Sequence, residues 1–178
     1  MDMTEKKIEG KEIFAGTMLH VYKDTVKCPN GAISTREYVK HCRAAAILPI
    51  TDDGRVILER QFRYPFNEVL IEVPAGKCDA GETTRDAAIR ELREETGYSE
   101  KTLEYLGDFY PTSAYSDEVI GLYLAEGLIP GHNHLDKDES LEVFSVTKEE
   151  FFQMCKDGRI NDGKTLAIAL RYQLRQQD

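Results

Sequence analysis

The strongest constraint on the fold is the segment Pro74–Tyr98, "PAGKCDAGETTRDAAIRELREETGY", where a strand, a loop and a helix follow one another directly. The apolar run that ends in "PAG" predicts the strand, and "KCDAGE" predicts the loop. Ala88, Ile89 and Leu92 recur at helical spacing, which predicts a helix over about residues 83–96 with one buried face. The order of these elements indicates an α/β domain.

The predicted helix concentrates acidic residues near its end. Glu91 and Glu95 are one turn apart, and Glu94 lies beside them. Like charges at this spacing destabilise a helix by roughly 0.2–0.5 kcal/mol per pair. One explanation is a solvated acidic face. The other is a hard divalent cation, which requires several oxygen ligands and would accept backbone carbonyls from the preceding loop as well.

The rest of the chain supplies further strands and two more helices. Apolar or alternating runs predict strands over residues 44–51, 56–62, 69–76, 103–110, 118–128 and 141–147. Amphipathic spacing predicts helices over residues 148–158 and 163–177, and residues 129–140 read as a polar loop. Strands flanked by helices predict an α/β/α sandwich with a mixed β-sheet.

The N-terminal part has a different pattern. Residues 11–40 read as short strands, with a turn at "PNGA", Pro29–Ala32. Two strands around a turn are only marginally stable alone. We therefore expect residues 1–42 to be a β extension that packs on the main domain, residues 43–178, or on a second subunit.

Composition narrows the classes of function. The chain has 178 residues, 41% of them hydrophobic and 31% charged, which is typical of a globular protein with one main core. Its net charge of -9 argues against nucleic acid or an anionic membrane as partner. The four cysteines show no metal-binding spacing, and we find no signal peptide or membrane-spanning run, so the expected compartment is the cytoplasm.

The acidic helix and its loop resemble the Nudix box. The family pattern has glycine, glutamate and an arginine–glutamate–apolar–x–glutamate–glutamate–x–glycine run at fixed spacing. The residues in register with it are Gly76, Glu82, Arg90, Glu91, Leu92, Glu94, Glu95 and Gly97. One position departs, since Tyr98 stands where an aliphatic residue is usual. The strand order from about Arg43 onward also resembles the family.

The resemblance implies hydrolysis of a nucleoside diphosphate linked to another group, with Mg²⁺ or Mn²⁺ as cofactor. The residues at its metal-binding positions are Glu91, Glu95 and the backbone carbonyl of Ala75, and Glu94 is a further ligand or contacts a bridging water. Arg90 is expected to orient these carboxylates through charge-assisted hydrogen bonds. Glu82 either binds a more weakly held ion or caps the junction of loop and helix.

The flanking segments "STREYVKH", "ERQFRYP" and "IEVPAGK" resemble the ADP-ribose pyrophosphatase branch. Its substrate-binding arginines correspond to Arg36 and Arg63, and the alternative is that both are surface residues of strands. Glu72 is expected to face the substrate sugar or support a neighbouring contact, or else to lie in the sheet interior. The branch pattern changes at "YPTSAYSDE", residues 110–118, although Glu118 keeps its place.

The general base is expected outside the box, because a cation depresses the pKa of the carboxylates that bind it. Glu139, at the junction of the acidic loop and a strand, aligns best with the family position. Glu142, three residues on, is the alternative, and Glu118 follows if neither acts. The loop could also be acidic without a catalytic role.

These inferences predict an enzyme that converts ADP-ribose to AMP and ribose 5-phosphate and acts as a homodimer joined by its N-terminal strands. A broader nucleoside-diphosphate-sugar pyrophosphatase is the alternative within the same class. A non-catalytic ADP-ribose sensor is the alternative from a different class, and the intact box argues against it.

Overall fold

The computed structural model describes residues 1–135 and 140–176. Within it the chain forms two compact units, one made of Met1–Cys42 with Thr112–Glu118, the other of the remaining chain from Arg43. The first unit holds the strands β1 (Lys6–Ala15), β2 (His20–Lys27) and β3 (Ile33–Lys40).

The second unit holds the remaining strands and the three helices among the described residues. Its strands are β4 (Ala44–Ile50), β5 (Arg55–Arg63), β6 (Glu68–Glu72), β7 (Ala75–Lys77), β8 (Tyr98–Ser99), β9 (Thr102–Phe109), β10 (Ile120–Glu126), β11 (Ile129–Pro130) and β12 (Leu141–Thr147). Its helices are α1 (Thr84–Thr96), α2 (Lys148–Asp157) and α3 (Gly163–Arg175).

The main sheet of the second unit is mixed. Its strand order is β12–β5–β4–β10–β9, with β6 paired to β5 and β7 paired to β4. The pair of β4 and β10 is parallel, and the other pairs are antiparallel. A parallel pair needs a crossover connection, and the chain between β4 and β10 supplies one that includes α1.

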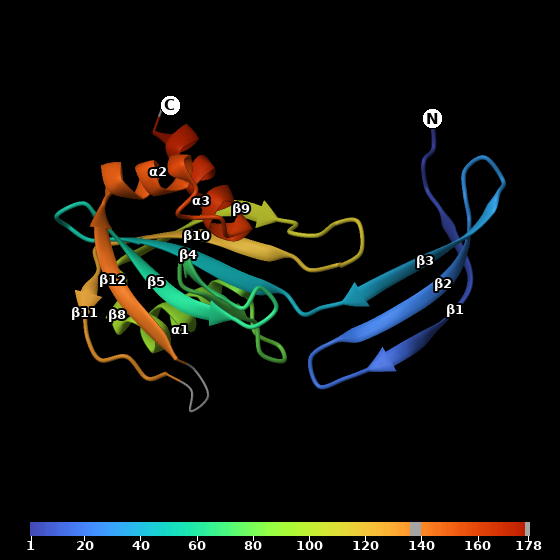
Figure 1. The fold of residues 1–178 in the computed structure, drawn as a ribbon, viewed down its shortest axis with the longest axis horizontal. Helices are drawn as coiled ribbons and strands as arrows, with labels where there is room; N and C mark the ends of the chain where they lie inside the picture. The colour runs from blue at the N-terminus through green and yellow to red at the C-terminus, as the bar shows by residue number, and fades with distance from the viewer. Residues whose placement is uncertain (136–139, 177–178) are drawn as a thin grey trace. The chain divides into compact units, whose positions relative to one another are not determined.

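Strand β4 is buried along its whole length, and its two faces pack against different helices. Ala46 and Leu48 join the core formed with α2 and α3, whereas Ala45 and Ile47 pack against α1. Successive side chains of a strand point to opposite faces, so the helices cover both sides of the sheet (Figure 1). The predicted α/β sandwich with a mixed sheet is confirmed.

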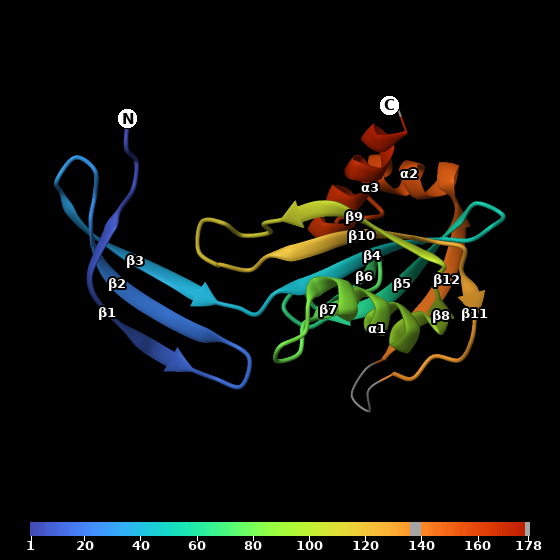
Figure 2. The ribbon, with the colours of Figure 1, turned by 180° about the vertical axis from the view of Figure 1, so that it is seen from behind.

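The run predicted as one strand over residues 69–76 is two strands. Glu72 ends β6, which pairs with β5, whereas Ala75 begins β7, which pairs with β4. Pro74 lies between them and lacks a backbone N–H, so it cannot continue the β5 ladder. Figure 2 shows β6 and β7 near the first turn of α1. The chain therefore changes partner strand at the entrance to the Nudix-like loop.

The first unit contains three strands, where the sequence predicted two. The missed turn lies at Gly16–Leu19, where the N–H of Gly16 donates to the carbonyl of Leu19 at 2.9 Å. The unit also includes Thr112–Glu118, which the sequence analysis assigned to the main domain. Ser116 forms a parallel bridge with Val39 at the end of β3.

Helix α1 ends at Gly97, whose backbone has the left-handed conformation with φ 77°. The loop after β11 returns to this helix end, and the N–H of His134 donates to the carbonyl of Glu94 at 2.8 Å. A Cβ atom on Gly97 would lie 2.8 Å from the backbone nitrogen of Asn133. Gly97 thus serves both the cap and the close approach of a second backbone.

Gly97→Ala is expected to destabilise the protein more than Gly81→Ala. Both glycines have positive φ, 77° and 85°, which costs an alanine about 1–2 kcal/mol. Among residues 1–135 and 140–176, nothing lies within 4 Å of a Cβ on Gly81, whereas Gly97 faces backbone atoms that must move, which adds about 1–3 kcal/mol. Urea unfolding measures both. Equal losses would show that backbone strain alone requires Gly97.

Candidate active site

Helix α1 presents two acidic residues to the sheet. It begins at Thr83, whose hydroxyl accepts a hydrogen bond from the N–H of Asp86 and so fixes the first turn. Glu91 and Glu95 lie on the sheet side and are only 8% and 2% exposed. This burial rules out a solvated acidic face for these two carboxylates.

Both carboxylates meet the short strand β7. Oε2 of Glu95 accepts the backbone N–H of Ala75 at 3.0 Å. The carboxylate of Glu91 occupies the space above Gly76, where any Cβ atom would overlap it. A side chain at position 76 is therefore incompatible with this placement of Glu91, which is a physical reason for glycine in the motif.

Arg90 donates hydrogen bonds to the carboxylates of Glu82, Glu91 and Glu94. Its Nε and Nη2 donate to Glu82 at 3.0 and 2.9 Å, and its Nη1 donates to Glu91 at 2.8 Å and Glu94 at 3.0 Å. Nη2 also donates to the carbonyl of Lys77 at 2.9 Å, so each of the five guanidinium N–H groups has an acceptor.

The charges of this cluster shift its titration. Hydrogen bonds from Arg90 lower the pKa of Glu82, and the N–H of Asp79 adds to this effect at 2.8 Å. In turn the hydrogen bond to Glu82, followed by those to Glu91 and Glu94, raises the pKa of Arg90. Because Glu82 is bonded to Asp79 in the loop and to Arg90 on the helix, it joins the loop to α1.

The donor set fits a hard divalent cation in kind. Carboxylate oxygens of Glu91, Glu94 and Glu95 lie on one helix, beside the Ala75 strand, and Gly76 leaves the room that the carboxylate of Glu91 occupies. Within residues 1–135 and 140–176, no three His, Cys, Asp or Glu side chains are arranged to hold a metal ion. Among these carboxylates, Glu91 and Glu94 face the Arg90 guanidinium.

A second cluster of charges surrounds Glu72, which is 1% exposed. Arg63 donates to its two oxygens from Nε and Nη2, at 2.7 and 2.6 Å, in a side-on pair. Lys164, at the start of α3, forms an ion pair with the same carboxylate. Burial acts to raise the pKa of Glu72, but the hydrogen bonds from Arg63 and the charge of Lys164 outweigh it and lower the pKa.

Glu142 lies away from the box carboxylates. On β12 it stands opposite Arg60 of β5, and its Oε2 is 3.1 Å from Nη1 of that arginine. The Arg60 guanidinium lies over the ring of Phe144, which packs into the core beneath α2 and α3. Glu142 therefore lies on the sheet face opposite α1, and the structure does not bring it together with Glu91 and Glu95.

Two other predicted residues belong to the first unit. Arg36 belongs to the first unit, where its guanidinium forms an ion pair with Glu5. Glu118 belongs to the same unit, and its Oε1 is 3.5 Å from Nδ1 of His41. Glu139 lies outside the described residues.

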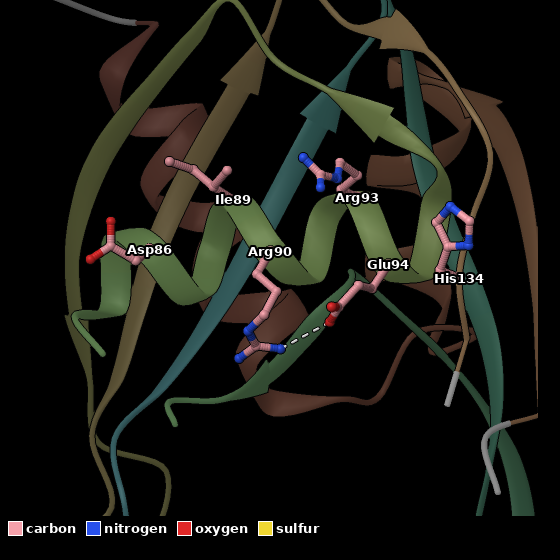
Figure 3. A pocket seen from close by; sticks show the side chains of 6 residues that line it. All are labelled: Asp86, Ile89, Arg90, Arg93, Glu94 and His134. Carbon is pink, nitrogen blue, oxygen red and sulfur yellow. Dashed lines mark hydrogen bonds and ion pairs between the residues drawn. The ribbon is translucent and has the colours of Figure 1, made fainter. Parts of the chain in front are cut away.

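A pocket of about 610 Å³ opens on the outer side of α1. Its lining residues are Asp86, Ile89, Arg90, Arg93, Glu94 and His134. Figure 3 shows Arg90 and Glu94 paired on this side of the helix, with His134 on the neighbouring loop. Glu91 and Glu95 do not line this pocket, because they face the sheet.

Residues 40–167 match the profile of the NUDIX domain. The chain belongs to the Nudix family. Nudix hydrolases generally use divalent metal ions. The Nudix chain is 40% identical over 172 residues to the ADP-ribose pyrophosphatase of Bacillus subtilis (strain 168), which covers 96% of this chain and 92% of that protein.

Two further comparisons agree with this family. The Nudix chain is also 40% identical over 170 residues to the methanol dehydrogenase activator of Bacillus methanolicus, with 94% of this chain and 91% of that protein covered. Its fold matches the crystal structure of an ADP compounds hydrolase with a TM-score of 0.88 at 20% identity, over 99% of this chain and 97% of that one. Among the described residues of this Nudix protein, no helix is long and apolar enough to cross a membrane.

Sequence reasoning missed the α3 residues that meet the Glu72 segment. Lys164 pairs with Glu72, and the hydroxyl of Thr165 accepts the backbone N–H of Val73 at 3.0 Å. The local signal was Asp162 as a helix-capping residue, which predicts where α3 begins but not what its first turn contacts.

Glu72→Gln is expected to destabilise the Nudix protein in a pH-dependent way. The pKa of Glu72 is lower in the folded protein than its ordinary value of 4.5, so its stabilising contribution is complete above that value and is lost as the pH falls through the folded pKa. At pH 7 we expect a loss of about 1.5–3 kcal/mol in the free energy of unfolding. Urea unfolding should show the difference shrink as the pH falls below about 4.5. A difference independent of pH contradicts this account.

Proposed function

We propose that this protein hydrolyses the diphosphate of ADP-ribose to AMP and ribose 5-phosphate. The observation that carries the proposal is the burial of Glu91 and Glu95 against Ala75 and Gly76, within a complete Nudix box. Support for the substrate comes from the Bacillus subtilis relative, which is named an ADP-ribose pyrophosphatase and is aligned with nearly the whole chain.

Each part of the box has a place in this proposal. Glu91, Glu94, Glu95 and the carbonyl of Ala75 would hold Mg²⁺ or Mn²⁺, which when bound neutralises the diphosphate and promotes attack by water on phosphorus. Arg90 holds Glu91 and Glu94 in place against their mutual repulsion, and Glu82 fixes the start of the helix through Arg90. One water is consumed as one P–O bond of the diphosphate breaks.

Arg63 is the residue on which the substrate-binding proposal rests. Its Nε and Nη2 are fixed by Glu72, and its side chain is 36% exposed. Among the described residues its Nη1 has no hydrogen-bond acceptor, so this edge is available to a phosphate oxygen. In this proposal Glu72 holds Arg63 in place and does not itself contact the substrate. Arg36 would have to leave its ion pair with Glu5 before it could bind the substrate.

We propose Glu139 as the general base. The alternative, Glu142, lies on the face of the sheet away from α1 and is paired with Arg60. A base carboxylate contributes about 10²–10⁴ to the rate and must reach the attacking water. The position of Glu142 on the sheet face away from α1 supports Glu139 as the first residue to test.

The experiment that tests the function is a substrate panel with Mg²⁺: ADP-ribose, NADH, GDP-mannose and ATP. We expect ADP-ribose to have a kcat/KM at least about tenfold above the others and to yield AMP and ribose 5-phosphate. Glu95→Gln is the control, with kcat lowered about a thousandfold because a charged oxygen ligand is lost. Its apo stability should hold, since repulsion within the helix is relieved. A tenfold preference for another substrate would falsify the assignment.

We also propose a homodimer formed through β1–β3. In this sheet only Asp24 and Val26 are buried, and every residue of β1 is exposed. Ile8 and Phe14 on β1 are each 56% exposed, so the sheet leaves apolar area that a second copy can cover.

The dimer predicts a mass in light scattering of twice the 20.2 kDa chain at micromolar concentration. Ile8→Glu is expected to shift the mass toward that of one chain, because it places a charge in the proposed interface. Leu170→Glu on α3 is the matched control, since Leu170 is 57% exposed and Ile8 is 56% exposed. A wild-type monomer, or equal effects of both variants, contradicts the proposal.

A further inference from the structure

The first turn of α3 is hydrogen-bonded to the segment of residues 72–76, which leads into the Nudix box. The N–H of Val73 donates to Oγ1 of Thr165 at 3.0 Å, and this hydroxyl donates its proton to Oδ2 of Asp162 at 2.6 Å. Thr165 is fully buried. Water therefore cannot replace its hydroxyl, and the backbone at Val73 depends on this one acceptor.

Lys164 extends the same contact to the substrate-binding arginine. Its Nζ pairs with Oε2 of Glu72 and lies 3.1 Å from Oδ1 of Asp162, and its side chain is only 11% exposed. Glu72 in turn holds Arg63 side-on. The carboxylate of Glu72 therefore sets the direction in which Nη1 of Arg63 points, and Lys164 of α3 holds this carboxylate in place.

The segment of residues 72–76, which α3 contacts at Glu72 and Val73, is contacted by α1 at Ala75 and Gly76. Glu95 accepts the N–H of Ala75 at 3.0 Å, and Glu91 packs over Gly76. Between them Pro74 has no N–H to offer, and its carbonyl accepts the N–H of Ile47 at 2.9 Å. A shift at Val73 is therefore passed along a short, tightly held backbone to the Ala75 carbonyl.

We propose that Asp162, Lys164 and Thr165 are positioning residues, which set the direction of the Arg63 guanidinium and the place of the Ala75 carbonyl. The inference rests on the proposed function of that site. Two cations, Arg63 and Lys164, pair with the carboxylates of Glu72 and Asp162, and the buried carboxylate of Glu59 also acts on Arg63. Loss of Lys164 leaves a net negative charge beside the arginine and disfavours an anionic substrate.

The test compares Lys164→Met, Thr165→Val and Thr165→Ser with wild type. Steady-state kinetics with ADP-ribose gives kcat and KM, calorimetry with Mn²⁺ alone gives the metal affinity, and thermal unfolding reports the fold. Arg175→Met is the matched control, because Arg175 lies on the same helix but pairs with Glu104 on the surface.

We expect Lys164→Met to raise KM at least about fivefold while kcat changes less than about twofold, since it removes charge near the substrate but no box residue. Thr165→Val should weaken Mn²⁺ binding at least about fivefold, because the Ala75 carbonyl is displaced, and Thr165→Ser should restore it. Arg175→Met should change neither quantity.

The outcomes separate this inference from the proposed function. If wild type cleaves ADP-ribose while Lys164→Met keeps its KM and Thr165→Val keeps its Mn²⁺ affinity, the positioning role is overturned and the function stands. If wild type does not cleave ADP-ribose, the function fails, and the Mn²⁺ titrations still decide the role of Thr165. If Thr165→Val does not fold, the KM of Lys164→Met decides the proposal.

Discussion

Mutual repulsion of carboxylates is the constraint around which the site is built. Glu91 and Glu95 are one turn apart and both are buried, which is unfavourable for like charges in a medium of low dielectric constant. Arg90 compensates for Glu91, and the backbone N–H of Ala75 compensates for Glu95. The helix, the loop and β7 are therefore needed together, since each supplies a partner that the others lack.

The proposed substrate-binding and metal-binding groups are joined by a short stretch of backbone. Glu72, at the end of β6, fixes Arg63, and Ala75, at the start of β7, meets the box helix. Because these strands pair with neighbouring strands of one sheet, the two groups sit on a rigid frame rather than on a loop. This arrangement limits how far the arginine can move relative to the carboxylates.

The sequence predicted the parts of the site that depend on local spacing. Glu82, Arg90, Glu91 and Glu94 are gathered because one helix and its loop bring them together. Lys164 could not be predicted, because it reaches Glu72 across 92 positions of sequence. The same limit applied to Glu142, because only the packing of Phe144 into the core beneath α2 and α3 showed that this face of β12 points away from α1.

In the fold as a whole, too, the sequence predicted what depends on local spacing and missed what depends on long-range pairing. The buried run of β4 and the helical spacing of α1 were readable without tertiary context, whereas the break at Pro74 reflects a change of partner strand that no local pattern reports. The turn at Gly16–Leu19 was missed because strand-forming residues lie on both sides of it.

The inclusion of Thr112–Glu118 in the first unit has a consequence for biosynthesis. Strands β1–β3 leave the ribosome early, but Ser116 and Asp117, which pair with the end of β3, are made only after most of the second unit's sheet has been translated. Domains generally fold as units during synthesis. Here the N-terminal sheet completes its hydrogen bonding late, so during translation the end of β3 presents open backbone groups to other nascent chains.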